Sequence, residues 1–503
     1  MNNARICVSL AAATAEEVFR QIARAAQSAD IIEIRFDHLN IREIEKVLSD
    51  LPQIHKQYLF TFRPIAEGGR REISLTERLD FWTRVRTTMG HLDFMVDLEQ
   101  DLELPFSFGR ERTIVSSHNF GAKRDDAAVF GELLQKDASI VKIADSVKTI
   151  TDSIPLWHLL ERAAAAGRSL IPIAMGEAGK FTRILGPANG TFLTYAALEN
   201  DAVTAPGQLT MSDLNEVYRI KRLDPQTDIY GIVAGDSSYS VSPYMHNPAF
   251  VAEDINAVFV PLQVADLSEF IVRMVKPELR EVEINFKGFS ITNPHKQAII
   301  SHLDAIDDVA KSIGAVNTIK IENGKFHGYN TDAPAFIEPL IRILGDIRGM
   351  HAAIAGAGGA ARACVYSLKQ CGADVTILGR DVARAAGLAD EFGVRYGDIA
   401  GGFEGMDILV NATPLGTKGA HENVSIARGK QLHGVKLVYD LNYNPVETML
   451  IGEAALAGIP TISGLEMLVA QGARQFEIWT GRKAPLEVMR HGVEKKLALE
   501  NSQ

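Results

Sequence analysis

Two lysines in this chain occupy settings that favour different chemistry. Lys142 lies inside the apolar run Ser-Ile-Val-Lys-Ile-Ala, where lost hydration lowers the pKa of an amine and lets it attack a carbonyl as a Schiff-base nucleophile. Lys296 ends the segment Thr-Asn-Pro-His-Lys, a loop setting that keeps an ammonium hydrated and able to protonate a hydroxyl or carbonyl oxygen. The sequence therefore predicts two catalytic centres of different kinds.

Titratable residues follow the expected strands around Lys142. An iminium on Lys142 would make the neighbouring carbon acidic, His118 could move a proton, and Glu67 could orient the imidazole. Arginines bind carboxylates bidentately, so we expect a small hydroxylated keto acid as substrate. This chemistry leaves an aldolase and a dehydratase both open. The residues expected at this site are Glu33, Arg35, Arg63, Glu67, His118, Lys142 and Arg183.

Eight short runs rich in apolar and β-branched residues precede residue 223, and helical patterns separate most of them. The runs begin at Ile6, Ile31, Tyr58, Phe94, Thr113, Ile140, Leu170 and Thr191. The strands should therefore be parallel. Their number and the segment length favour a closed (β/α)8 TIM barrel, with residues 212–223 as its last helix, over an open sheet with two edges. In such a barrel, functional groups gather at the C-terminal strand ends, where the charged residues above fall.

Motifs in residues 1–222 resemble those of type I 3-dehydroquinate dehydratases. They are Glu33-Ile-Arg35-Phe-Asp, Thr61-Phe-Arg63-Pro with Glu67-Gly-Gly, Ser116-Ser-His118-Asn-Phe, Val141-Lys142-Ile-Ala, Gly176 with Thr182-Arg183, and Ala205-Pro-Gly-Gln208. The resemblance implies Lys142 as the Schiff-base residue, His118 as the general acid and base, and Glu67 as its partner. It implies substrate binding by Ser9, Glu33, Arg35, Arg63, Arg183, Thr204 and Gln208. Thr204 stands where the family usually has Ser, and it keeps the hydroxyl.

A second and a third βα series follow the polar linker Leu223-Asp-Pro-Gln-Thr-Asp. The segment Gly-Ala-Gly-Gly-Ala-Ala, residues 356–361, directly follows an apolar strand and opens a helix, which is the context of a dinucleotide pyrophosphate site. Arg380 follows the next strand, where NAD enzymes place an acid, so a ribose 2′-phosphate and NADP are favoured. Because Asp381 lies beside Arg380, NAD stays an alternative cofactor. Arg384 is a second candidate for binding the 2′-phosphate.

Motifs between Gly231 and Gly481 resemble shikimate dehydrogenase. They are Ser240-Val-Ser242-Pro, Ile291-Thr292-Asn-Pro-His-Lys296, Gly314-Ala-Val-Asn317-Thr, Asn330-Thr-Asp332, Gly356-Ala-Gly-Gly, Asn411-Ala-Thr-Pro, Asp440-Leu-Asn-Tyr443-Asn-Pro and Gly464-Leu-Glu-Met467 running on to Gln471. The resemblance implies Lys296 and Asp332 as the catalytic pair. It implies substrate binding by Ser240, Ser242, Thr292, Asn317, Tyr443 and Gln471. It implies cofactor binding by Gly356, Ala357, Gly358, Gly359, Ala360, Arg380, Arg384, Asn411, Thr413, Gly464 and Met467.

The catalytic pair makes chemical sense because hydride transfer to a ketone develops an alkoxide that needs a proton. A charged Lys296 beside Asp332 can supply and replace that proton. Four residues depart from the family pattern: Tyr239, Ser290, Ala333 and Gly379 stand where His, Asn, Gly and Asn are usual. Ser290 shares a strand face with Thr292, so its change bears on selectivity between quinate and shikimate.

These patterns predict three domains. They are a dehydratase barrel in residues 1–223, a shikimate-binding α/β domain in residues 229–335 completed by C-terminal helices in 466–503, and a Rossmann NADP-binding domain in residues 336–465. The expected function is dehydration of 3-dehydroquinate followed by reduction of 3-dehydroshikimate to shikimate with NADPH. One alternative is a catabolic enzyme acting on quinate with NAD. A non-catalytic sensor or repressor is disfavoured because Lys142, His118, Lys296 and Asp332 are all present.

Composition excludes several other classes of function. The 63 acidic and 52 basic residues give a formal net charge of −11, a poor match to nucleic acid or an anionic membrane. No apolar run is long enough to span a bilayer, and the segment from Arg5 to Ala15 has too weak a basic start and too short an apolar run for a signal peptide. The odd set Cys7, Cys364 and Cys371 lacks metal-ligand spacing. We therefore expect a soluble, reduced, cytoplasmic enzyme without a metal, and its oligomeric state stays open.

Overall fold

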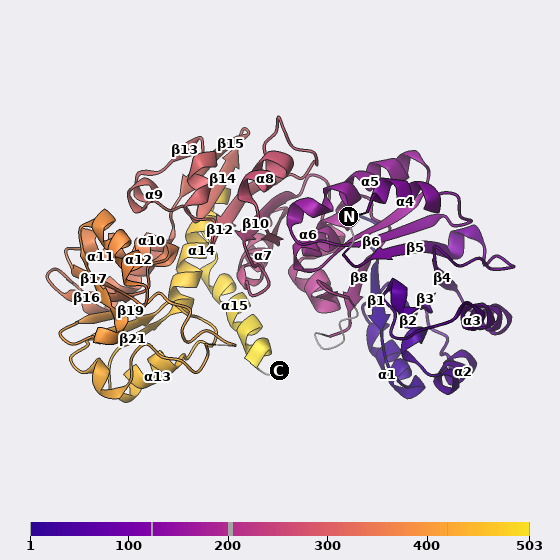
Figure 1. The fold of residues 1–503 in the computed structure, drawn as a ribbon, viewed down its shortest axis with the longest axis horizontal. Coiled ribbons are helices and arrows are strands. Elements are labelled where there is room, and N and C mark those ends of the chain that lie inside the picture. The colour runs from indigo at the N-terminus through magenta and orange to yellow at the C-terminus, as the bar shows by residue number, and fades with distance from the viewer. Residues whose placement is uncertain (1, 122–123, 200–204, 420, 502–503) are drawn as a thin grey trace. The chain divides into compact units, whose positions relative to one another are not determined.

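The computed structural model describes residues 2–121, 124–199, 205–419 and 421–501 (Figure 1). The chain forms two compact units. The first comprises Met1–Ile229, Asp236–Ser238 and Asn256–Asn285, and the second comprises Tyr230–Gly235, Tyr239–Ile255 and Phe286–Gln503. Within the described ranges, no helix is both long enough and apolar enough to cross a membrane.

A parallel barrel dominates the first unit. Its strands lie in the order β7-β6-β5-β4-β3-β2-β1-β8-β9. A bridge between Leu170 and Thr191, just before β8, closes the ring. The predicted barrel is thus confirmed. The strands are β1 (Ile6–Leu10), β2 (Ile31–Arg35), β3 (Gln57–Thr61), β4 (Phe94–Glu99), β5 (Thr113–Asn119), β6 (Ile140–Ser146), β7 (Ser169–Met175), β8 (Thr194–Ala197) and β9 (Leu209–Thr210).

The barrel helices begin where the sequence supplies caps. In α3, Ser74 and Glu77 form a reciprocal capping box, which satisfies two backbone N–H groups that a helix start leaves unpaired. The helices are α1 (Ala15–Ala25), α2 (Ile41–Asp50), α3 (Leu75–Thr88), α4 (Asp126–Leu133), α5 (Ile154–Ala165) and α6 (Lys180–Leu185). The connection from β4 to β5 has no α-helix, only the 3-10 turn Arg110–Arg112. Pro105 and Gly109, which has a φ of 93°, interrupt that segment.

The prediction of one last helix over residues 212–223 is wrong. The segment contains a π-helical turn, Asp213–Val217, and a 3-10 turn, Ile220–Arg222. Between them Arg219 has a φ of 48°. A residue in this left-handed conformation cannot continue a right-handed helix, so the helix is broken there.

Side-chain alternation along the strands divides the barrel interior into layers. Cys7, Ile31, Leu59 and Met95 belong to a buried apolar cluster. Two residues further along the same strands stand Ser9, Glu33, Thr61 and Asp97, all buried. Because successive side chains point to opposite faces of a strand, a two-residue step keeps the same inward face. The polar layer therefore lies at the C-terminal strand ends, above an apolar floor.

The second unit contains two sheets. In one of them β10 (Asp228–Ala234), β12 (Phe286–Ile291), β14 (Thr318–Glu322), β15 (Lys325–Tyr329) and β13 (Ala305–Ile306) lie side by side in that order. The hairpin β14–β15 turns at Asn323 and Gly324, whose φ values are 53° and 75°. The helices of this part are α7 (Ser242–Ala252), α9 (Asp308–Ile313), α10 (Asp332–Leu344), α14 (Gly464–Thr480) and α15 (Leu486–Asn501). Strand β11 (Ala257–Gln263) and α8 (Leu267–Phe270) belong to the first unit.

In the other sheet each strand is parallel to its neighbours, and the order is β18-β17-β16-β19-β20-β21. Its strands are β16 (His351–Ala355), β17 (Asp374–Gly379), β18 (Arg395–Asp398), β19 (Ile408–Asn411), β20 (Leu437–Asp440) and β21 (Thr461–Ser463). Its helices are α11 (Gly359–Gln370), α12 (Val382–Phe392) and α13 (Met449–Leu456). The strand order reverses between β16 and β19, the crevice where open α/β sheets bind ligands.

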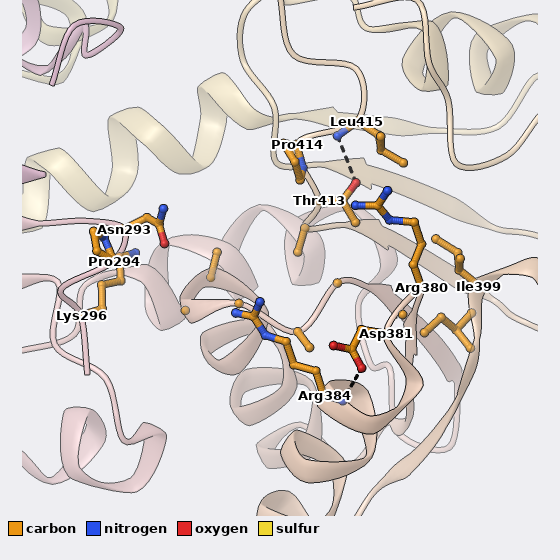
Figure 2. Close-up of a pocket in the computed structure, with 18 of the residues that line it drawn as sticks. Asn293, Pro294, Lys296, Arg380, Asp381, Arg384, Ile399, Thr413, Pro414 and Leu415 are labelled. Carbon is orange, nitrogen blue, oxygen red and sulfur yellow. Dashed lines mark hydrogen bonds between the residues drawn. The ribbon is translucent and has the colours of Figure 1, made fainter. Parts of the chain in front are cut away.

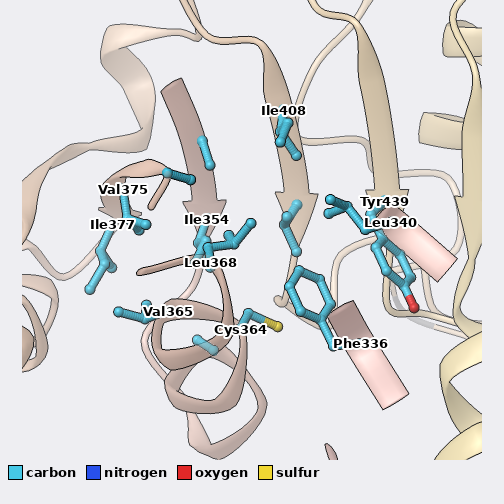
Figure 3. Packing of buried hydrophobic residues seen from close by; sticks show 14 of the residues in the cluster. Phe336, Leu340, Ile354, Cys364, Val365, Leu368, Val375, Ile377, Ile408 and Tyr439 are labelled. Carbon is cyan, nitrogen blue, oxygen red and sulfur yellow. The ribbon is translucent and has the colours of Figure 1, made fainter. Parts of the chain in front are cut away.

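A continuous apolar core fixes this sheet against its helices (Figure 3). Phe336 and Leu340 of α10, Leu368 of α11 and Ile354 of β16 are all fully buried. The Phe336 ring stacks on Tyr439 with centroids 5.0 Å apart. Each such apolar side chain contributes about 1.5–3 kcal/mol through burial. The core therefore holds the loop after β16 in place relative to α10, which carries Asp332.

Candidate active sites

Lys142 lies in the middle of β6 and points into the barrel. Its side chain is only 4% exposed, and its Nζ donates to Asp97 Oδ2 at 2.8 Å and to Tyr195 Oη at 3.1 Å. Burial lowers the pKa of Lys142. The Asp97 carboxylate opposes that decrease, and the nearby Arg63 guanidinium adds to it. The amine is therefore poised closer to neutrality than an exposed lysine.

Arg63 shares the carboxylate that pairs with Lys142. Its Nη2 donates to Asp97 Oδ2 at 2.5 Å, and its Nε lies 3.4 Å from Glu99 Oε1. Although Asp97 is fully buried, the two cations hold its pKa well below the usual range. One Asp97 oxygen thus accepts hydrogen bonds from two positively charged groups. The cationic groups of Arg63, Lys142 and Arg183 in this pocket suit an anionic or hydroxyl-rich substrate.

His118 stands at the end of β5 and is fixed by Glu67. The Glu67 Oε2 accepts from the His118 backbone N–H at 2.9 Å and lies 3.1 Å from Nδ1. Burial lowers the pKa of His118 well below its ordinary value, and Arg63 and Lys142 lower it further. Its Nε2 is buried and has no hydrogen-bond partner among the described residues. A neutral imidazole with a free nitrogen can accept a proton from a substrate carbon.

The remaining predicted barrel residues line the same pocket. Glu33 accepts from Ser9 Oγ and from Thr61 Oγ1, and Arg35 makes a two-bond pair with Asp37 at 2.9 and 2.8 Å. Burial lowers the pKa of Arg183 to about 10. The predicted residues on the pocket wall are Ser9, Glu33, Arg35, Arg63, Glu67, His118, Lys142, Arg183 and Gln208. Thr204 lies outside the described residues.

Sequence reasoning missed Asp97 and Tyr195. Both lie inside runs that were recognised as strands, in β4 and β8, and both contact Lys142. The Lys142 ammonium also lies 4.3 Å from the centre of the Tyr195 ring. Counting in steps of two from the apolar floor would have assigned Asp97 to the inward face.

Lys296 and Asp332 meet in the second unit, as predicted. Lys296 Nζ donates to Asp332 Oδ2 at 2.5 Å, and Asn317 Nδ2 donates to Asp332 Oδ1 at 2.8 Å. Asp332 begins α10, where the helix dipole favours a negative charge. Both carboxylate oxygens are therefore occupied, one by the cation and one by a neutral amide.

A buried hydrogen-bond network holds Asp332 in place. Asn317 Oδ1 accepts from the Thr331 backbone N–H at 2.8 Å and from Thr318 Oγ1 at 2.8 Å. Asn330 Oδ1 accepts from the Asp332 N–H at 3.1 Å, and its Nδ2 donates to the Ala315 carbonyl at 2.9 Å. Asn330 and Thr331 lie in the motif Asn-Thr-Asp but were not predicted as positioning residues.

The other predicted substrate residues occupy several neighbouring elements. The Ser242 backbone N–H donates to Ser240 Oγ at 3.3 Å at the start of α7. Thr292 follows β12 and lines the pocket that also contains Lys296. In α14, Gln471 donates to the Leu468 carbonyl at 2.9 Å. Tyr443 follows β20, and burial raises its pKa. Their roles toward substrate stay predictions.

Ser290 has a specific partner that the sequence reasoning did not identify. Gln475 Nε2 donates to Ser290 Oγ at 3.1 Å and to the Asn317 carbonyl at 3.2 Å. Gln475 is one helical turn after Gln471 on α14, a spacing that places both on one face. Gln475 therefore links the Ser that departs from the family pattern to Asn317, which directly precedes β14.

A pocket of about 840 Å³ lies at the C-terminal end of β16 (Figure 2). Figure 2 shows Arg380 near Thr413–Leu415 at one side of it and Lys296 at the other, with Arg384 between them. Asp381 accepts from the Arg384 backbone N–H at 3.1 Å and thereby caps α12. The predicted cofactor residues that line this pocket are Gly356, Ala357, Gly358, Gly359, Ala360, Arg380, Arg384 and Thr413.

The glycine loop fits a dinucleotide pyrophosphate. Gly356 has a φ of 110°, and a Cβ there would lie 2.8 Å from the Ala412 carbonyl oxygen. Gly358 has no heavy atom within 4 Å of the corresponding position, so its face is open for a phosphate. The helix α11 starts at Gly359, and the free N–H groups of a helix start bind phosphate oxygens.

Three predicted cofactor residues do not line the pocket. Asn411 is fully buried and supports the loop after β19, since its Oδ1 accepts from Thr413 Oγ1 at 2.7 Å. Gly464 begins α14, and a Cβ there would lie 2.2 Å from the Leu441 carbonyl oxygen. Met467 belongs to the apolar core. In the described part of the chain, no group of three or more His, Cys, Asp or Glu residues could hold a metal ion.

Comparisons with protein families match the two halves of the chain separately. The type I 3-dehydroquinase model matches residues 6–225. The shikimate dehydrogenase substrate binding domain matches residues 232–319, and the shikimate 5′-dehydrogenase C-terminal domain matches residues 464–493.

Individual relatives extend the likeness to the whole chain. The chloroplastic bifunctional 3-dehydroquinate dehydratase/shikimate dehydrogenase of Arabidopsis thaliana is 35% identical over 517 residues, covering 97% of this chain and 84% of that protein. The shikimate dehydrogenase (NADP(+)) of Methanococcus maripaludis is 38% identical over 55% of this chain and all of that protein. A crystal structure of a shikimate dehydrogenase in complex with NADP+ has a TM-score of 0.50 and 36% identity, covering 55% of this chain and 97% of that one.

Proposed function

We propose that this chain, which belongs to the family of bifunctional 3-dehydroquinate dehydratase/shikimate dehydrogenases, carries out its two reactions at the two lysine sites described above. The barrel dehydrates 3-dehydroquinate through a Schiff base on Lys142. The second site reduces the resulting 3-dehydroshikimate to shikimate with NADPH. The product of the first site is the substrate of the second.

In the barrel, the Lys142 amine adds to the ketone carbon of 3-dehydroquinate, and loss of water forms an iminium. His118 Nε2 takes a proton from the carbon next to the iminium. The hydroxyl on the following carbon then leaves with the proton that His118 returns. Hydrolysis of the iminium frees Lys142 and releases 3-dehydroshikimate.

One observation carries the dehydratase mechanism. Lys142, whose pKa is lowered by burial, and His118, whose Nε2 has no partner among the described residues, line one pocket. Glu67 fixes the imidazole through Nδ1 and so directs Nε2 toward that pocket. We assign Arg183 and Gln208 to the carboxylate end of the substrate, and Glu33, Arg35 and Arg63 to its hydroxyls, because all five line this pocket.

In the second unit, the residues around the 840 Å³ pocket fit NADP. The loop from Gly356 to Ala360 would hold the pyrophosphate, and Arg380 and Arg384 the 2′-phosphate. NADPH, when bound, supplies the hydride to the ketone carbon. Lys296 gives its proton to the oxygen of that ketone, and Asp332 favours the return of a proton to Lys296.

The paired test uses the chain's own two activities. Reduction of the substrate adduct with borohydride, followed by peptide mapping, should label Lys142. Lys142→Ala should abolish dehydration and leave shikimate oxidation by NADP intact, and Lys296→Ala should do the reverse. Each activity is thus the folding control for the variant in the other site. Label on any residue but Lys142 would contradict the Schiff-base assignment. Faster oxidation of quinate with NAD than of shikimate with NADP would contradict the dehydrogenase assignment.

A further inference from the structure

A line of alternating charges leads from the catalytic lysine of the barrel to its outer helix layer. Beyond Arg63 it continues through Glu99, the last residue of β4, to Arg78 of α3. Arg63 Nε lies 3.4 Å from Glu99 Oε1, and Arg78 Nη1 lies 3.6 Å from Glu99 Oε2. Arg78 in turn donates to both oxygens of Asp101, at 2.8 and 2.5 Å. Glu99 therefore bridges a pocket arginine and a helix arginine.

Glu99 is buried and incompletely bonded. Its side chain has no exposed surface, and its Oε2 has no hydrogen-bond partner among the described residues. Burial raises the pKa of Glu99 to about 8; Arg63 and Arg78 oppose the increase, and Asp97 adds to it. From β5, the neighbouring residue across the ladder is the uncharged Ser116. This carboxyl group can therefore gain or lose its charge near neutral pH.

We propose that Glu99 is a positioning residue of the dehydratase, which orients Arg63 toward the substrate. The inference rests on the proposed roles of Lys142 and Arg63. Asp97 holds one nitrogen of the guanidinium, and Glu99 faces another. Two acceptors on different nitrogens fix the plane of the guanidinium, which one acceptor cannot do.

The first variant is Glu99→Gln, which keeps the size of the side chain and removes its charge. We expect KM for 3-dehydroquinate to rise about fivefold, the size of one weakened charge-assisted hydrogen bond. We expect kcat at its optimum to change less than about twofold. The comparison is made above pH 8, where Glu99 is ionised. A merely structural role would lower the fraction of folded chain and leave KM of the folded fraction unchanged.

Arg78→Met tests the same coupling from the other end of the line. This variant removes a cation next to Glu99 and leaves the contact between Glu99 and Arg63. Glu99 then loses the cation that faces its Oε2, so KM should rise by less than in Glu99→Gln while kcat stays nearly constant. Arg78→Lys should restore KM. Arg84→Met is the matched control, since Arg84 lies on the same helix and pairs with the surface residue Glu45 at 3.0 Å.

Borohydride trapping in each variant separates the outcomes. One mole of adduct per mole of chain at saturating substrate establishes an intact barrel site in Glu99→Gln, and Arg78→Met carries the test if Glu99→Gln does not fold. Label away from Lys142 in the unmodified chain overturns the Schiff-base mechanism and this inference together. Label on Lys142 with an unchanged KM in both variants overturns the inference alone.

Discussion

The two arginines of the cofactor pocket allow a quantitative test of discrimination between NADP and NAD. Arg380 and Arg384 line the pocket opened by the glycine loop, and both are exposed. The competing acid, Asp381, is engaged as the cap of α12 through the Arg384 backbone N–H. Asp381, the residue that kept NAD as an alternative cofactor in the sequence, thus has a structural role. The variants that test the cofactor preference are Arg380→Ala alone and Arg380→Ala combined with Arg384→Ala.

The expected magnitude follows from one charge-assisted hydrogen bond per arginine. Such bonds are worth about 1.5–3 kcal/mol, and the lower end applies here because both guanidinium groups are exposed to solvent and screened. A change of 1.4 kcal/mol is a factor of about ten. Each single variant should therefore lower kcat/KM for NADP roughly tenfold, and the double variant roughly a hundredfold if the effects add.

The assay is steady-state oxidation of shikimate with NADP and with NAD at two salt concentrations. The value for NAD should change less than about twofold, because NAD lacks the 2′-phosphate. The loss with NADP should shrink at high salt. Arg395→Ala is the matched control, an exposed arginine of β18 outside the pocket. An equal decrease for NADP and NAD would refute the assignment of these arginines to the 2′-phosphate.

Three further outcomes are expected. His118 has a pKa well below that of an exposed imidazole, 6.5, so the unfolded chain binds a proton that the folded chain does not. The barrel should lose about 1.4 kcal/mol of stability per pH unit below that value, and thermal melts of His118→Gln should lose this dependence. Leu368→Ala opens a cavity in the core around β16 and should destabilise the dehydrogenase half by about 2–5 kcal/mol, measured as a lower temperature of inactivation with unchanged borohydride trapping. A Cβ on Gly359 would lie 3.0 Å from Lys296 Cδ, so Gly359→Ala should displace Lys296 and lower kcat of shikimate oxidation roughly tenfold. The added methyl group of Gly358→Ala would face open space instead, so this variant should raise KM for NADP.

The barrel could be predicted from the sequence because two independent patterns agree. Each strand is a short apolar run, and the catalytic candidates of the barrel stand inside such a run or follow it. In a parallel barrel these ends meet at one rim. The position of Lys142 beside Arg63 was thus foreseeable from topology, although the two residues are distant in sequence.

The missed features depend on geometry that apolar patterning does not encode. Asp97 and Tyr195 lie within recognised strands, but their contact with Lys142 depends on which strands become neighbours across the barrel. The break in the predicted helix over residues 212–223 depends on the left-handed backbone of Arg219, which its residue type does not favour. The hairpin turn at Asn323-Gly324, by contrast, could have been predicted from the sequence, since this dipeptide is the strongest short signal for a two-residue turn.

Both candidate sites contain a lysine paired with an aspartate, but the two lysines lie in different surroundings. In the barrel, Lys142 is 4% exposed, and burial lowers its pKa; Asp97 opposes that decrease and Arg63 adds to it. The same Asp97 oxygen accepts from both Lys142 and Arg63. In the second unit, Lys296 is 16% exposed and donates to Asp332, and the neutral amide of Asn317 takes the other carboxylate oxygen. The deeper burial of Lys142 therefore supports the proposed difference in roles, a nucleophilic amine in the barrel and a proton donor in the second unit.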